Sequence, residues 1–175
     1  MELKLFNKAV GMVFDNPLMT AGFKLHDQKI EKHSCQRVYI SGDKHISISA
    51  NVHPLDYPSH YNIVLGQGSL EWPDIDWNSV ALWRIKGAID PKVKAHEYSL
   101  MHLDEEKLTF SLNHAKNELF NYGKSFLEGN LELFKRVRGD QNKNREPYKI
   151  YTPTGNGSRV VSYDEVSKAL KEKYS

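Results

Sequence analysis

The eight histidines of this chain are the residues whose type most readily suggests chemistry. Imidazole is a common metal ligand, and metal sites usually recruit at least two ligands at close spacing in the sequence. No two of these histidines lie within four residues of each other. His45 and His53 share one face of an expected strand, but eight residues of strand span about 26 Å. The spacing therefore predicts no metal site, and we expect no cofactor.

Cys35 is the single cysteine, which rules out an internal disulfide and a cysteine-only zinc site. A thiol becomes a good nucleophile when a neighbouring base or cation lowers its pKa. His33 lies two residues away, and in an extended chain the two side chains point the same way without being forced into contact. We therefore expect Cys35 to be inert or half-exposed rather than catalytic.

Two short patterns resemble ligand-binding motifs only in part. The segment TGNGS, residues 154–158, contains two glycines but lacks the lysine and the following helix of a phosphate-binding loop, so it predicts a hairpin turn. The segment DID, residues 74–76, has alternating carboxylates of the kind that hold a divalent ion in some sugar transferases. Two alternating acids are a common accident, so this spacing alone predicts no metal.

The segment EWPDIDW, residues 71–77, combines two of the three tryptophans with three carboxylates and a proline. In one interpretation both indoles are core residues beneath a loop, with the carboxylates in water. In the other, one indole stays exposed inside an acidic rim that suits a basic protein, since aromatic anchors supply affinity and charge complementarity supplies rate. The candidate partner-binding residues are Glu71, Trp72, Asp74, Asp76 and Trp77.

A second candidate surface is the basic stretch from Lys135 to Lys149, which would bind RNA if Tyr148 and Tyr151 stacked on bases beside it. Cations near the end of a helix also stabilise its dipole in any protein, and the formal net charge of the chain is only +2. We prefer the structural explanation for these cations. The residues of this alternative interface are Lys135, Arg136, Arg138 and Arg145.

A third alternative is a small hydrolase-like enzyme whose site is assembled from residues that are distant in the sequence. Its candidates are His53 and His60 together with Asp56 or Asp74. A deep pocket with converging polar groups would favour this alternative, whereas a flat aromatic surface would favour binding.

Periodic apolar residues predict the elements that must position these candidates. Alternation predicts a hairpin over residues 36–53 with its turn at SGDK, and a further strand over 60–68, with Ser47, Ser49 and Asn51 on a solvated face. Helical spacing predicts a helix over the first fourteen residues, stopped by Asn16 and Pro17. Weaker patterns predict strands over 79–89 and 96–103.

The strongest helical signal follows Asp104, which is expected to cap a long helix that Gly123 interrupts. A second helical segment is expected from Gly129 to about residue 138. A small hairpin over 148–163 and a closing helix, begun by a capping box of Ser162 and Glu165, complete the chain.

These elements predict an α+β fold, an antiparallel sheet of four to five strands with an N-terminal helix and C-terminal helices packed on one face. Consecutive strands without intervening helices argue against a doubly wound dinucleotide-binding sheet. At 175 residues, 39% hydrophobic and 26% charged, the chain fits one domain over 1–175, with 148–175 as a possible hairpin-helix appendage. We see no signal peptide and no apolar run long enough for a membrane helix, so we expect a cytoplasmic protein.

The order of these features resembles the small cytosolic immunity proteins of bacterial polymorphic toxin systems and their uncharacterised relatives. The resemblance covers residues 1–138 as a layout of short helix, strand meander, tryptophan-bearing middle and terminal helices. Its specific matches are GF at residues 22–23 and YGKSFLEG from Tyr122. The basic stretch and the segment from Tyr148 onward depart from that layout.

The resemblance implies a non-enzymatic protein that occludes one cognate toxin, often a basic nuclease, through an acidic or aromatic surface. Our leading hypothesis is accordingly a monomeric or homodimeric cytoplasmic protein that binds a protein partner through residues 71–77, without membrane or nucleic-acid contacts.

Overall fold

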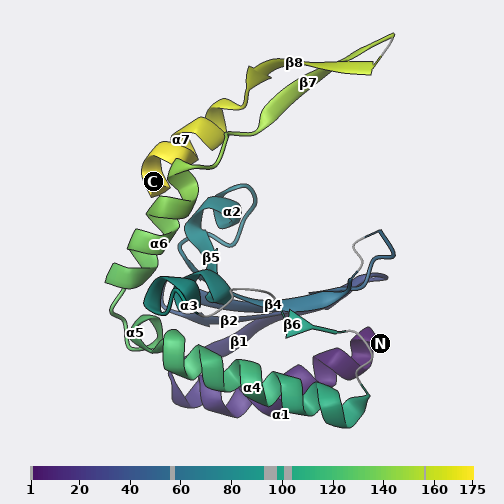
Figure 1. Cartoon of the computed structure of the whole chain (residues 1–175), viewed down its shortest axis with the longest axis vertical. Helices are drawn as coiled ribbons and strands as arrows, with labels where there is room; N and C mark the ends of the chain where they lie inside the picture. The colour runs from purple at the N-terminus through teal and green to yellow at the C-terminus, as the bar shows by residue number, and fades with distance from the viewer. Residues whose placement is uncertain (1, 56–57, 93–97, 101–103, 156) are drawn as a thin grey trace.

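One antiparallel sheet lies against two long helices, and a C-terminal unit of shorter elements rises beyond one end of it (Figure 1). This computed structural model describes residues 2–55, 58–92, 98–100, 104–155 and 157–175. The strand order is β1-β2-β3-β4-β5, with β6 paired to β4. The expected α+β class is therefore confirmed. The strands of this sheet are β1 Lys24–Ile30, β2 Ser34–Ser41, β3 Lys44–Asn51, β4 His60–Gln67, β5 Ser79–Ala81 and β6 Tyr98–Ser99.

Alternating apolar residues of β2, β3 and β4 build the buried face of the sheet. Ile48 lies opposite Ile63, and Ile46 opposite Leu65, and all four are fully buried. Gly42 closes the predicted β2–β3 hairpin with φ of 62°, a conformation that glycine adopts without strain. The opposite face is less solvated than expected, because Ser47 is buried and accepts a hydrogen bond from the Gln36 amide at 2.8 Å.

The helices α1 and α4 cover the apolar face of the sheet; they are α1 Leu3–Thr20 and α4 Glu105–Tyr122. The expected stop of α1 at Asn16 and Pro17 is wrong, since the helix continues to Thr20 with Pro17 inside it. Proline removes one helical hydrogen bond, but fully buried Phe14 and Leu18 hold the last turn against the core. The cap of α4 is confirmed, because the Asp104 carboxylate accepts from the Lys107 amide at 2.8 Å.

Two other segments differ from the predictions. Residues 79–89 form the short β5 and then α3 Leu82–Ile89, where Leu82 and Ile85 bury the face that meets the sheet. The branched residues of this segment favoured a strand, but tertiary packing selects the helical spacing instead. All seven residues of β1 are exposed, so this edge strand carries no alternation that would have predicted it. In the segment 96–103, β6 covers residues 98–99, while 96–97 and 101–103 lie outside the described residues.

The C-terminal unit contains a helix pair and a hairpin that projects away from the sheet (Figure 1). Gly123 ends α4 as expected, and α7 begins at a different cap than expected, because Asp164 rather than Ser162 accepts from the Ser167 amide. Over the described part of the chain, no helix combines the length and apolarity needed to cross a bilayer. The remaining helices and strands are α2 Asp74–Asn78, α5 Lys124–Leu127, α6 Glu132–Lys143, β7 Lys149–Thr154, β8 Gly157–Tyr163 and α7 Glu165–Tyr174.

Candidate functional site

The two tryptophans of the EWPDIDW segment lie in opposite environments. Trp77 is completely buried and forms a second, smaller core with Leu170 and Tyr174 of α7. The Asn142 amide of α6 donates to the backbone oxygens of Trp77 at 2.8 Å and of Tyr174 at 3.1 Å, which fixes α2 to both helices. The indole of Trp77 is therefore structural and has no surface for a partner.

Trp72 is 72% exposed and is the accessible aromatic residue of the segment. Its ring stacks on Tyr148 with centroids 5.7 Å apart and planes 14° apart. Tyr148 in turn contacts the edge of Trp77 at 6.0 Å, so the exposed indole rests on a ring that is itself anchored to the buried core. Trp72 thus presents a large apolar surface while its ring packs on Tyr148.

The Asp74 carboxylate is used to hold the C-terminal helix. Asp74 accepts hydrogen bonds from the Tyr174 hydroxyl and the Asn78 amide, both at 2.8 Å, and lies 3.3 Å from the Lys173 ammonium. Burial opposes ionisation of Asp74, but these hydrogen bonds and the lysine charge outweigh it and lower the carboxyl pKa.

Asp76 is likewise used for contacts within the chain. Its carboxylate accepts from the Tyr148 hydroxyl at 2.6 Å and faces the Arg145 guanidinium at 3.4 Å. Burial, and then the hydrogen bond to Asp76, raise the pKa of Tyr148 to about 12. Asp76 and Glu71 are both exposed, but Asp76 is paired with Arg145 and Asp74 with Lys173, so the predicted acidic rim is mostly neutralised.

The basic stretch does not form one open cationic surface. Lys135 and Arg136 are exposed, but Arg138 is buried with its guanidinium over the rings of Phe134 and Tyr174. Arg145 lies 4.4 Å above the Trp77 ring and donates to the Asp76 carbonyl. Half of the residues predicted for an RNA interface, Arg138 and Arg145, therefore lie over aromatic rings of the second core.

The dispersed histidine and aspartate candidates are not brought together. His60 begins β4, whereas Asp74 lies beyond the other end of that strand, which spans about 23 Å. Asp56 lies outside the described residues. The ring of His53 instead meets that of His33 at 4.8 Å, edge to face, and the described residues include no group of three or more metal-ligating side chains. Cys35 is buried, and burial raises the pKa of its thiol.

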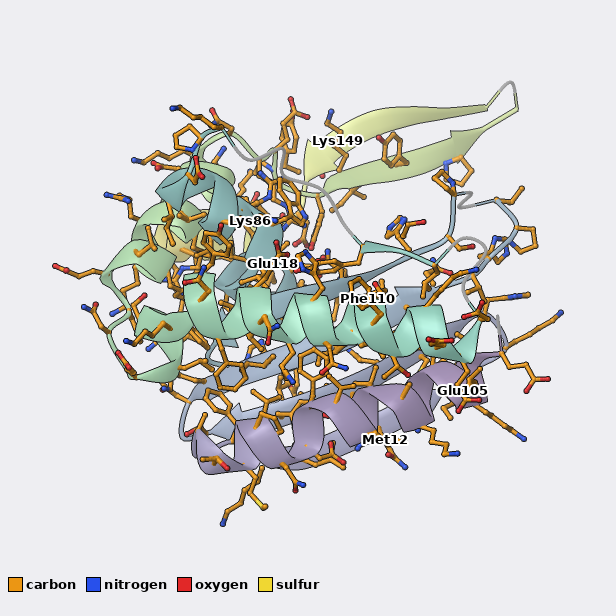
Figure 2. The ribbon with its side chains drawn as sticks, turned by 60° about the horizontal axis from the view of Figure 1, so that its bottom comes forward. Met12, Lys86, Glu105, Phe110, Glu118 and Lys149 are labelled. Atoms are coloured by element: carbon orange, nitrogen blue, oxygen red, sulfur yellow. The ribbon has the colours of Figure 1, made fainter. Side chains whose placement is uncertain are left out.

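The structure assembles an ionic cluster that sequence reasoning missed, because its members come from three separate elements. Lys86 of α3 pairs with Glu118 of α4 (Figure 2), and Tyr98 of β6 donates to the same carboxylate at 2.7 Å. His114 lies 3.4 Å from Glu118 one turn earlier. Burial raises the pKa of Glu118, but the hydrogen bonds from Lys86 and Tyr98 reverse this and leave the pKa lowered. Through Glu118, the cluster ties α3 and β6 to α4.

We expect Glu118→Gln to lower the free energy of unfolding by about 2 kcal/mol, because it leaves the Lys86 ammonium largely buried without its counter-charge. The side chains keep 17% and 11% of their surface exposed, so the loss should be below that of a fully buried pair. Urea denaturation at pH 7 measures it. The matched control is Glu128→Gln, which removes an exposed pair with Lys124 and should change stability by less than about 0.5 kcal/mol. Equal losses in both variants would contradict a role for this buried pair.

A second buried polar contact lies where β3, β4 and β5 meet. The His45 imidazole is 1% exposed, and its Nε2 lies 3.2 Å from the Ser79 hydroxyl, which donates to Asn78. A Cβ on Gly66 would lie 2.0 Å from His45 Nε2, so only glycine leaves room for the ring. Burial lowers the pKa of His45 to about 4, which keeps the ring neutral at physiological pH.

Comparison with known proteins identifies no family for this chain. No protein-family model matches the chain, and neither the curated proteins nor the solved structures gave a match.

Proposed function

We propose that this chain is a non-enzymatic protein-binding protein whose contact surface is centred on Trp72. The observation that carries the proposal is that Trp72, although 72% exposed, stacks on Tyr148, which itself contacts the buried Trp77. Tryptophan is among the residues that most often dominate binding energy at protein interfaces. A side chain already ordered before binding loses less conformational entropy when a partner covers it.

The pairing of the aspartates refines which partner this surface suits. Asp74 and Asp76 are neutralised by Lys173 and Arg145, so the segment offers a partner an apolar ring rather than a field of negative charge. Affinity at this surface should therefore depend on burial of the Trp72 indole and only weakly on salt.

A toxin is the partner class that we propose from the resemblance of the layout to immunity proteins, with the cytoplasm as compartment and a monomer or homodimer as the binding form. The exposed indole supports this proposal because occlusion of a partner requires an accessible anchor. The basic character of such a toxin would have to be recognised by residues other than Asp74 and Asp76.

We expect Trp72→Ala to weaken binding of the partner at least about 30-fold, the loss typical of a central aromatic anchor. The partner is captured from source cells on the immobilised wild-type chain, identified, purified and titrated by calorimetry. The matched control is Phe110→Ala, which removes a similarly exposed aromatic ring, 78% accessible, from α4 (Figure 2).

Binding should survive Phe110→Ala unchanged. Circular dichroism of both variants checks that neither has lost its fold. A partner that binds the folded Trp72→Ala variant as tightly as the wild type would remove this surface from the interface.

A further inference from the structure

A groove runs between α3 and α6, next to the second core but separate from the Trp72 ring. Its cavity volume is about 730 Å³, and Gly87 and Ala88 of α3 and Val137 of α6 supply its small and apolar lining. The polar lining includes Arg84 of α3 and Asp140 of α6. This combination of apolar walls and a few polar groups is typical of sites that bind part of another molecule.

Arg84 is the unpaired charge of the groove. Its side chain is exposed, and it forms no ion pair with any residue that the structure describes. Its guanidinium carbon lies 4.4 Å above the ring of Trp83, which also lines the groove. A guanidinium held over an indole ring by a cation–π contact still has N–H groups that can donate to an acceptor.

Trp83 adds a second donor without an acceptor. Its indole N–H is buried and has no hydrogen-bond partner among the described residues. A buried donor without a partner is rare in folded proteins and calls for a specific explanation. Arg84 therefore lines the groove as a donor without an acceptor, and Trp83 contributes a buried indole N–H that has no hydrogen-bond partner among the described residues.

We infer that this groove binds a carboxylate group, with Arg84 donating to it and the Trp83 ring beneath. The planar guanidinium fork matches the two oxygens of a carboxylate. Asp140 also lines the groove and pairs with an exposed lysine, Lys143, at 3.6 Å. Its negative charge repels a phosphate dianion more strongly than a carboxylate monoanion, so the lining favours the carboxylate.

The neighbouring surface indicates which molecule supplies the carboxylate, and this step depends on the proposed function. Arg145 lines the groove and lies over Tyr148, on which Trp72 stacks. The groove and Trp72 are thus joined through two contacts, so one partner can engage both. The group that enters the groove is then an aspartate or glutamate side chain of the protein that covers Trp72.

Two-dimensional NMR of the indole N–H groups of the full chain tests the groove directly. The probe is N-acetyl-glutamate N-methylamide, and the control compound is the neutral glutamine analogue at equal ionic strength. The Trp83 signal, assigned from Trp83→Phe, should shift saturably with the glutamate compound and not with the glutamine one. Arg84→Gln should weaken this binding at least tenfold, whereas Arg136→Gln, at an exposed arginine of α6, should change it less than twofold.

The inference is overturned if both compounds shift the Trp83 signal alike, if Arg84→Gln binds as well as the wild type, or if inorganic phosphate binds more tightly than the glutamate compound. This test is independent of the partner. Carboxylate binding with unchanged partner affinity in Trp72→Ala would remove the proposed function but keep the groove. If Trp72→Ala loses partner binding but the wild-type chain binds no carboxylate, the groove inference is removed and the proposed function is kept.

Discussion

Trp77→Ala should lower the free energy of unfolding by about 3 to 5 kcal/mol, the range for removing a buried tryptophan. Trp77 is completely enclosed and is the largest member of the cluster that joins α2 to Leu170 and Tyr174. Its loss also removes the ring on which Arg145 lies at 4.4 Å. Urea denaturation at pH 7, followed by far-UV circular dichroism, measures the change.

The nearby Trp72 provides the control for Trp77, because it is the same residue type in the same segment. Trp72→Ala removes a ring that is 72% exposed and should cost less than about 1 kcal/mol. Limited proteolysis should cleave the C-terminal unit of Trp77→Ala faster than that of Trp72→Ala, since α7 packs on α2 and α6. Equal stability losses in the two variants would show that the second core does not hold the C-terminal helix.

Acidification from pH 6.5 towards pH 4 should destabilise the protein by about 3 kcal/mol through His45 alone. Burial lowers the pKa of His45 in the folded state to about 4 from an ordinary value of 6.5. Within this range the unfolded chain binds a proton that the folded protein excludes, so stability falls as pH falls. Above about pH 7.5 both states are neutral at this residue, and its contribution is constant.

The His45 effect is isolated by comparing unfolding free energies at pH 7.5, 6.5, 5.5 and 5.0, above the range where most carboxylates titrate. His45→Gln should be less stable at pH 7.5 but should lose most of the pH slope between 6.5 and 5.0. His26→Gln, at an exposed position of β1, should keep the wild-type slope. An unchanged slope in His45→Gln would assign the acid sensitivity to other groups.

Local sequence patterns predicted the elements that bury one regular face. The β2–β3 hairpin, β4 and the capped helix α4 were predicted because alternation, helical spacing and a capping aspartate are all short-range signals. The extension of α1 through Pro17 and the helix α3 were not predicted, because packing against the sheet overrides the local preference of proline and of branched residues. The exposed edge strand β1 carries no periodic signal at all.

The features of the candidate site also divide into those that local sequence determines and those that depend on tertiary contacts. The sequence by itself determined that residues 71–77 concentrate aromatic and acidic side chains, and that the histidines lack the spacing of a metal site. Only the tertiary structure decided that Trp77 is core while Trp72 is exposed, and that Asp74 and Asp76 are paired with Lys173 and Arg145. These pairs join residues about 70 to 100 positions apart, and burial and charge neutralisation depend on such distant contacts, which no local spacing encodes.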